Sequence, residues 1–381
     1  MDKIYLDNNA TTALSPKALT AMLEELSGPA SNPSSVHSFG QKARQKLLRA
    51  HETIADFLGC RPQEVIFTSG GTEAMNTLIR SIANTLPKGQ IITSTIEHSC
   101  VDLMLADLKT AGWEIVALPP GEKGFISLEQ IENSISPATR FIVLAAVNNE
   151  TGVKCPVEAI GEFAQKKGIP FLVDGIAWIG KELFRLPVGI SGIGFSSHKF
   201  HGPKGVGFAI VRSPMRFFPL LVGGSQQNGK RAGTENLAGI LGTVAAIEEI
   251  PLVLPEASKR MLALRTTLEE GLSLSGALIN GNGERICNTV NMSFPGVDGE
   301  NLLIQLDQAG IAVSHGSACS AGAMELSRVL LNMGFLHERV RSSLRFSLSR
   351  MTTPEEINRC IEVTTRLVHL PALSISTGNV G

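Results

Sequence analysis

Short, mainly apolar runs alternate with segments of helical periodicity between residues 65 and 174, and this alternation restricts the possible folds more than any other feature. The runs cover residues 65–67, 91–94, 115–118, 141–147 and 171–173. The run at 141–147 contains no polar residue, which is typical of a strand buried on both faces of a sheet. The alternation predicts an α/β fold with a large, doubly wound and mostly parallel sheet.

Helix signals and a later change of pattern predict the domain organisation. Ser15 as N-cap and Pro16 open a helix over 15–26, and Gly59 ends a helix over 40–58. Beyond a glycine-rich loop at 223–236 we expect one helix ending near Ile250 and a separate one over 257–274. Further on, strands at 289–294, 311–313 and 343–347 accompany helices at 300–309 and from Thr353. We therefore expect a large domain over 15–255 and a smaller α+β domain built from 1–14 and 256–381.

Composition excludes several classes of partner. The 381 residues carry a formal net charge of −1 without a basic stripe, so we expect neither nucleic acid nor an anionic membrane as a partner. Residues 1–6 lack a signal-peptide core, and no apolar run has membrane-spanning length. The six cysteines show no paired spacing, which is typical of reduced thiols. We expect a cytoplasmic protein without a metal site.

Polar clusters follow the predicted strands, where an open parallel sheet binds its ligands. They lie at residues 69–72, 97–98, 148–149, 174 and 196–199. In the first cluster, Gly70, Gly71 and Thr72 stand at a helix N-terminus, whose N–H groups and dipole suit a phosphate. A tight turn with an N-cap would produce the same pattern, and the Walker pattern is absent because no Gly-Lys-Ser/Thr follows.

Lys199 and Asp174 indicate the kind of cofactor. Lys199 stands in the bend between two apolar runs, where it either points to solvent or reaches a ligand at the sheet edge. An amine partly withdrawn from water titrates lower and can form an imine with an aldehyde. A carboxylate at the end of a buried strand, as at Asp174, needs a cation or several donors, and a protonated pyridine nitrogen is such a cation. A phosphate seat, a buried carboxylate and an imine-forming lysine together describe pyridoxal 5′-phosphate (PLP).

The sequence resembles the cysteine desulfurases, PLP-dependent enzymes of the aspartate aminotransferase fold, over nearly its whole length. The similarity lies in many segments that occur in one order, namely residues 5–12, 32–37, 68–73, 97–98, 148–152, 196–199, 231–236 and 316–320. Residues 317–320 are similar to the group with a long, mobile cysteine loop.

The resemblance implies roles for individual residues. Lys199 would form the imine, Cys319 would be the nucleophile that takes the sulfur, and His98 would stack on the cofactor ring and assist as a base. The expected cofactor contacts are Gly71, Thr72, His98, Asn149, Asp174, Ser196, His198, Lys199 and, from the other subunit of a homodimer, Thr234. Asn149 and Arg345 would bind the substrate, and Arg345 would contact the carboxylate of the substrate.

The implied activity converts L-cysteine to L-alanine and passes the sulfur, as a persulfide on Cys319, to an acceptor such as an iron–sulfur scaffold or a sulfur carrier. One departure is Ala177, where the family usually carries a glutamine that contacts the phenolic oxygen of PLP; Ser197 and Ser225 also replace common glycines. Losing one such hydrogen bond costs about 1–3 kcal/mol, which slows an enzyme without abolishing its activity. A selenocysteine lyase, another PLP lyase or aminotransferase, and a weakly active homologue acting as a binding partner are therefore the alternatives.

Overall fold

A computed structural model of the chain describes residues 3–316 and 326–369. Within these residues a seven-stranded central sheet has the order β2-β8-β7-β6-β5-β3-β4. In that order the strands are Val65–Thr68, Gly207–Val211, Ile190–Ser196, Phe171–Asp174, Thr139–Ala145, Gln90–Ser94 and Glu114–Leu118. Strand β8 is antiparallel to its neighbours β2 and β7, and the remaining pairs are parallel. The predicted α/β fold with a mostly parallel sheet is confirmed.

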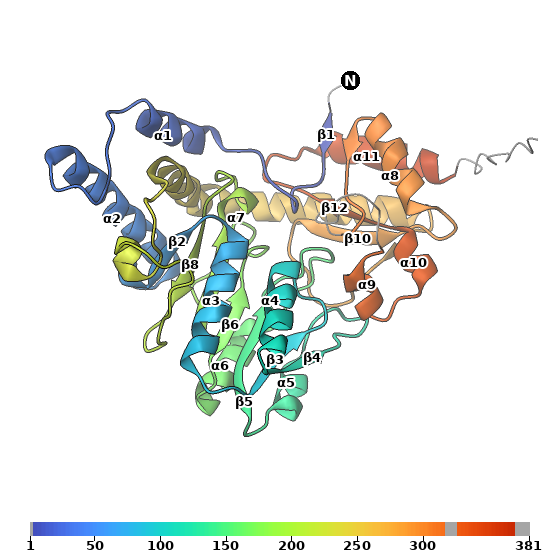
Figure 1. Ribbon diagram of the computed structural model, residues 1–381. Helices are drawn as coiled ribbons and strands as arrows, with labels where there is room; N and C mark the ends of the chain where they lie inside the picture. Colours follow the sequence, from blue (N-terminus) through green and yellow to red (C-terminus); the bar gives the residue numbers. More distant parts are fainter. Residues whose placement is uncertain (1–2, 317–325, 370–381) are drawn as a thin grey trace, which may run out of the picture.

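Helices cover both faces of this sheet, because successive side chains of a strand point to opposite faces. On β5, Phe141 and Val143 pack in one apolar cluster with α3 (Gly71–Thr85) and α4 (Ser99–Thr110), which lie in front of the sheet in Figure 1. Ile142 and Leu144 belong to a second cluster with the remaining helices of this region. These are α2 (Ser38–Leu58), α5 (Leu128–Ser134), α6 (Val157–Lys167) and α7 (Leu237–Ser273).

The helix boundaries predicted near the N-terminus follow from local capping. The Ser15 side chain accepts a hydrogen bond from the Ala18 N–H at the start of α1 (Pro16–Leu26). Gly59 ends α2 in the left-handed region at φ 74°, which a glycine adopts without strain. Both predicted signals are confirmed, although α2 begins at Ser38 rather than Gly40.

Helix α7 corrects the expectation of two helices on either side of residue 255. It runs unbroken for 37 residues with Pro251 and Pro255 inside it. A proline in a helix interior costs about 3 kcal/mol, but α7 packs against α1, α2 and α11 (Pro354–Val368) and buries Ile250 and Leu254. Tertiary packing therefore outweighs the local signal, and the predicted domain boundary falls inside the helix.

Helix α7 is also long and apolar enough to cross a membrane, a property that the sequence analysis did not identify. However, 61% of its most apolar window is buried inside the protein, as in a core helix.

The C-terminal part forms smaller sheets beside the carboxyl edge of the central one (Figure 1). Strand β10 (Thr289–Ser293) pairs antiparallel with β12 (Ser343–Ser347) and β9 (Leu278–Ile279). The N-terminal β1 (Ile4–Tyr5) pairs in parallel with β11 (Ile311–Ala312). The helices of this part are α8 (Gly299–Gln308), α9 (Arg328–Asn332), α10 (His337–Arg341) and α11. The N-terminal residues therefore lie within the C-terminal part of the fold, beside β11.

Candidate active site

A cavity of about 260 Å³ lies where the strand ends of the central sheet meet β12. It gathers most of the predicted site residues, which are Gly71, Thr72, His98, Asn149, Asp174, Ser196, His198, Lys199 and Arg345. Thr234 is exposed and does not line the cavity in this chain, and Cys319 lies outside the described residues. All of the cavity residues in this list except Arg345 lie at or just after the ends of five strands of the central sheet, as its parallel topology requires.

Lys199 ends a 3₁₀ turn (Ser197–Lys199) between β7 and β8. Its Nζ donates hydrogen bonds to the backbone carbonyls of Asn9 and Ala10, the second at 2.9 Å. The side chain thus points into the cavity and toward the N-terminal segment, whereas the neighbouring Lys204 is exposed. The sequence left open whether Lys199 points to solvent or toward the sheet edge, and the structure places its side chain at the cavity.

Asp174 is the last residue of β6 and is 6% exposed. Its Oδ1 accepts a hydrogen bond from the Ile176 N–H at 2.9 Å. Burial raises the pKa of Asp174, and this hydrogen bond and the charge of Lys199 oppose the rise. A cationic ligand nitrogen in the cavity would favour its ionised form further.

His98 caps the N-terminus of α4, where its Nδ1 accepts a hydrogen bond from the Cys100 N–H at 3.1 Å. Because Nδ1 is the acceptor, the neutral ring carries its proton on Nε2. Burial lowers the pKa of His98 and so favours the neutral ring. The cap fixes the imidazole at the cavity wall in a defined orientation.

The N-terminus of α3 offers a seat for an anion. No side chain caps this helix, and Thr72 and Ser196 bring two hydroxyls to the same end of the cavity. A Cβ on Gly71 would lie 2.2 Å from Cδ1 of Ile176, so any larger residue here would require the Ile176 side chain to move. His198 stands beside them with its pKa lowered to about 4 by burial, so its ring is neutral. Backbone N–H groups and hydroxyls are the donors that bind a phosphate at a helix N-terminus.

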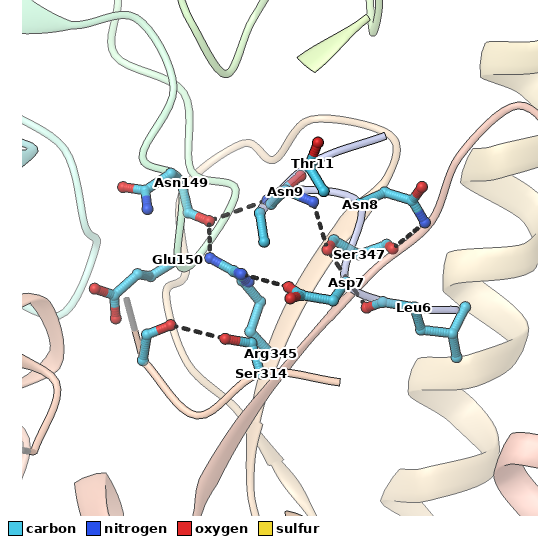
Figure 2. Close-up of polar contacts among 12 residues, drawn as sticks. Leu6, Asp7, Asn8, Asn9, Thr11, Asn149, Glu150, Ser314, Arg345 and Ser347 are labelled. Carbon is cyan, nitrogen blue, oxygen red and sulfur yellow. Dashed lines mark hydrogen bonds and ion pairs between the residues drawn. The ribbon is translucent and has the colours of Figure 1, made fainter. Parts of the chain in front are cut away.

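Arg345 reaches the opposite side of the cavity from β12 and is 1% exposed. Its Nη1 donates to the backbone carbonyl of Asn149 at 3.1 Å, and its Nη2 donates to Oδ1 of Asp7 at 2.6 Å (Figure 2). The guanidinium, which comes from β12, is therefore held by the N-terminal segment and by the loop after β5. A planar, fixed guanidinium suits a bidentate carboxylate.

Several cavity residues were not among the predicted site residues, namely Asn8, Asn9, Ala10, Cys100 and Lys181. Residues 8–10 belong to a segment already noted as a family motif, but the pairing of β1 with β11 and the hydrogen bonds of Asn8 and Asn9 to Ser347 bring them to the cavity. Lys181 carried no signal, because a lysine followed by a glutamate after a glycine resembles any surface lysine. Ala177 lines the cavity as well, so a methyl group occupies the wall where the family usually places an amide.

The chain is similar to known proteins over nearly its whole length. The family model described as "Aminotransferase class-V" matches residues 4–360. A protein from Nostoc sp. named "Cysteine desulfurase" is 39% identical over 380 residues, covering 98% of this chain and 95% of that protein. A solved structure titled "NIFS-LIKE PROTEIN" superposes with a TM-score of 0.90 at 34% identity, covering 96% of this chain and 99% of that one. A structure titled "SspA in complex with cysteine" gives a TM-score of 0.82 at 31% identity, covering 92% and 100%.

Proposed function

Because this chain belongs to the aminotransferase class-V family, we propose that it is a PLP-dependent cysteine desulfurase, which converts L-cysteine to L-alanine and retains the sulfur as a persulfide. The observation that carries the proposal is that Lys199, Asp174 and Arg345 line one cavity. An amine, a buried carboxylate and a fixed guanidinium are the groups needed to bind PLP and an amino acid side by side. The SspA structure, which shares the fold, is titled as a complex with cysteine.

The donor set of the cavity fits PLP. The uncapped N-terminus of α3, with Thr72 and Ser196, would hold the phosphate, and Asp174 would pair with the pyridine nitrogen. The His98 ring would lie against the cofactor ring, and the Lys199 amine would meet the aldehyde. When bound, PLP supplies an aldehyde for imine formation and a ring that accepts electrons from the substrate Cα.

The protein side chains then bind the substrate and move its protons. Arg345 binds the carboxylate of the substrate cysteine. Asn149 lies beside Arg345, because its backbone carbonyl accepts a hydrogen bond from Nη1 of Arg345. With PLP and substrate bound, the free amine of Lys199 would take the Cα proton. Neutral His98, with its proton on Nε2, can donate that proton to the substrate.

Cys319 is the proposed sulfur acceptor. The five described cysteines are free thiols, and burial raises the pKa of each of them, including Cys100 in the cavity wall. A thiol is nucleophilic as its thiolate, so these five are poorly suited to attack. In the proposed step the Cys319 thiolate attacks the substrate sulfur, so that an S–S bond forms and the Cβ–S bond of the substrate breaks. The electron pair of the broken bond stays on Cβ, which takes up one proton to give alanine.

We further propose a cytoplasmic homodimer that delivers the persulfide sulfur to an acceptor protein. Thr234 would cross to the partner's cavity, because it is exposed on a loop that Arg231 ties to Glu73, in the first turn of α3, at 2.9 Å. The loop thus lies next to the first turn of α3, while Thr234 does not line the cavity of its own chain.

Turnover by the purified protein tests the proposal. With L-cysteine and dithiothreitol, we expect sulfide and alanine in equal amounts, and neither product from Lys199→Ala. Transfer of an amino group from other amino acids to a 2-oxo acid, without sulfide release from cysteine, would indicate an aminotransferase, and turnover of selenocysteine alone would indicate a selenocysteine lyase. Either result would overturn the proposal, as would cofactor binding without any turnover.

A further inference from the structure

A second lysine lies buried at the cavity, directly behind Lys199. Lys181 is 4% exposed and lines the cavity, and its Nζ donates a hydrogen bond to the backbone carbonyl of Lys199 at 2.9 Å. Among the ion pairs of the described residues none includes Lys181. An ammonium buried without a carboxylate costs free energy, so its retention calls for a functional reason.

Local sequence brings this ammonium to its position. Gly180 has a φ of +73°, and a Cβ on it would lie 2.6 Å from Cβ of Phe200, the residue after Lys199. Only glycine allows this close approach in that conformation. The turn after β6 is therefore packed against the turn that carries Lys199.

Among the described residues, no carboxylate forms an ion pair with Lys181. The adjacent Glu182 turns away and pairs with Lys154 at 3.2 Å. Arg350, another cation near Lys181, is engaged by Glu249 at 2.9 Å. The other groups that face Lys181 are the Cys287 thiol, the His201 ring and Lys199, and those that face Lys199 include Asp174 and His98.

We propose that Lys181 is a positioning residue for Lys199. The ammonium group of Lys181 acts on Lys199 in two ways. It holds the backbone carbonyl of Lys199, which fixes the base of that side chain. Its positive charge in the same cavity disfavours a second ammonium and so favours the neutral, reactive amine of Lys199. The proposal rests on the proposed function, because imine formation requires the neutral amine of Lys199.

The titration of Lys181 is compatible with this role. Burial, followed by the charge of Lys199, lowers its pKa to about 8, so it remains largely protonated at neutral pH. The repulsion between the two ammonium groups is mutual, so Lys181 as a cation shifts Lys199 toward its neutral form.

Two variants separate the charge from the hydrogen bond. Lys181→Met removes both, whereas Lys181→Gln removes the charge and retains a donor for the Lys199 carbonyl. Lys204→Met is the matched control, since it removes a charge from the exposed lysine of the same bend. Thermal unfolding of all variants checks that they fold.

The decisive readout is the pH dependence of Lys199 acetylation, because acetic anhydride reacts only with a neutral amine. The full-length protein is first treated with hydroxylamine to remove carbonyl groups, and the extent of acetylation at Lys199 is measured by peptide mass spectrometry. Removing Lys181 should raise the midpoint for Lys199 by about one pH unit in both variants, and Lys204→Met should leave it unchanged. Sulfide release at pH values above the midpoint should fall in Lys181→Met and be partly restored in Lys181→Gln.

An unchanged midpoint in folded Lys181→Met would overturn the proposal, as would an equal shift in Lys204→Met. A lower melting temperature together with an unchanged midpoint would assign Lys181 a structural role only. The acetylation measurement needs no turnover, so it stands even if the protein proves not to be a desulfurase.

Discussion

Oδ1 of Asp7 and Nη2 of Arg345 lie 2.6 Å apart, and this ion pair joins residues 338 positions apart in the chain (Figure 2). The Arg345 side chain is 1% exposed and that of Asp7 17%. The N-terminal segment is thus part of the proposed carboxylate site, because it supplies the countercharge that holds the guanidinium in place.

Removing Asp7 should destabilise the protein. Asp7→Ala leaves a buried guanidinium without its carboxylate, and breaking a buried pair in this way costs about 3 kcal/mol or more. Urea unfolding measures the loss. Glu256→Ala is the control, because its pair with Lys259 is exposed on both sides and should contribute little. Equal stability of Asp7→Ala and wild type would contradict the role given to Asp7.

Glu97 should make stability fall as the pH rises. It is 2% exposed, and burial raises its pKa from 4.5 to about 8. Between these values the folded state binds more protons than the unfolded state, so the free energy of unfolding decreases from about pH 4.5 to about pH 8.

The Glu97→Gln variant should lose this slope, because a neutral amide does not titrate. Its stability relative to the wild type should therefore rise across that pH range. Chemical unfolding at several pH values gives the difference, with the exposed Glu256→Gln as control. A constant difference between Glu97→Gln and wild type would show that Glu97 is not protonated in the folded protein.

Cys319→Ala should retain PLP binding and lose sulfide and alanine production by roughly 10⁴-fold, as expected when a nucleophile is removed. Cys100→Ala is the matched control, since Cys100 lies in the cavity wall with a pKa raised by burial. Mass spectrometry after brief exposure to cysteine should place the extra sulfur on Cys319. A persulfide on Cys100, or full activity of Cys319→Ala, would refute the assignment.

Ala177→Gln should accelerate turnover. A glutamine at this cavity-lining position would restore a hydrogen bond of about 1–3 kcal/mol, which corresponds to roughly tenfold or more in rate. Ala177→Met fills similar space without a donor and serves as control. If the two variants release sulfide at the same rate, the missing hydrogen bond does not limit this enzyme.

Mixed dimers should reveal a shared active site. Neither Lys199→Ala nor Thr234→Ala should be fully active alone, but a mixture of the two chains contains one cavity with both residues intact. Re-association after mild denaturation should therefore restore part of the activity. A fully active monomer by sedimentation, or no recovery on mixing, would contradict the placement of Thr234 in the partner's cavity.

The sequence by itself determined the features that depend on neighbouring residues. Strand periodicity and strand ends predicted the sheet and the edge where Asp174 and Lys199 lie, because parallel strands bring their carboxyl ends together. Local caps such as Ser15 and Gly59 were readable for the same reason, since a cap is a hydrogen bond or a backbone angle within a few residues.

Only the tertiary structure decided the features that depend on distant segments. The sequence predicted two helices on either side of residue 255, but packing against three other helices keeps α7 continuous through Pro251 and Pro255. The pairing of Asp7 with Arg345 and the position of Lys181 behind Lys199 depend on strand pairing and on the close approach of two turns. Such contacts have no local signature, because burial and charge compensation are properties of the folded chain.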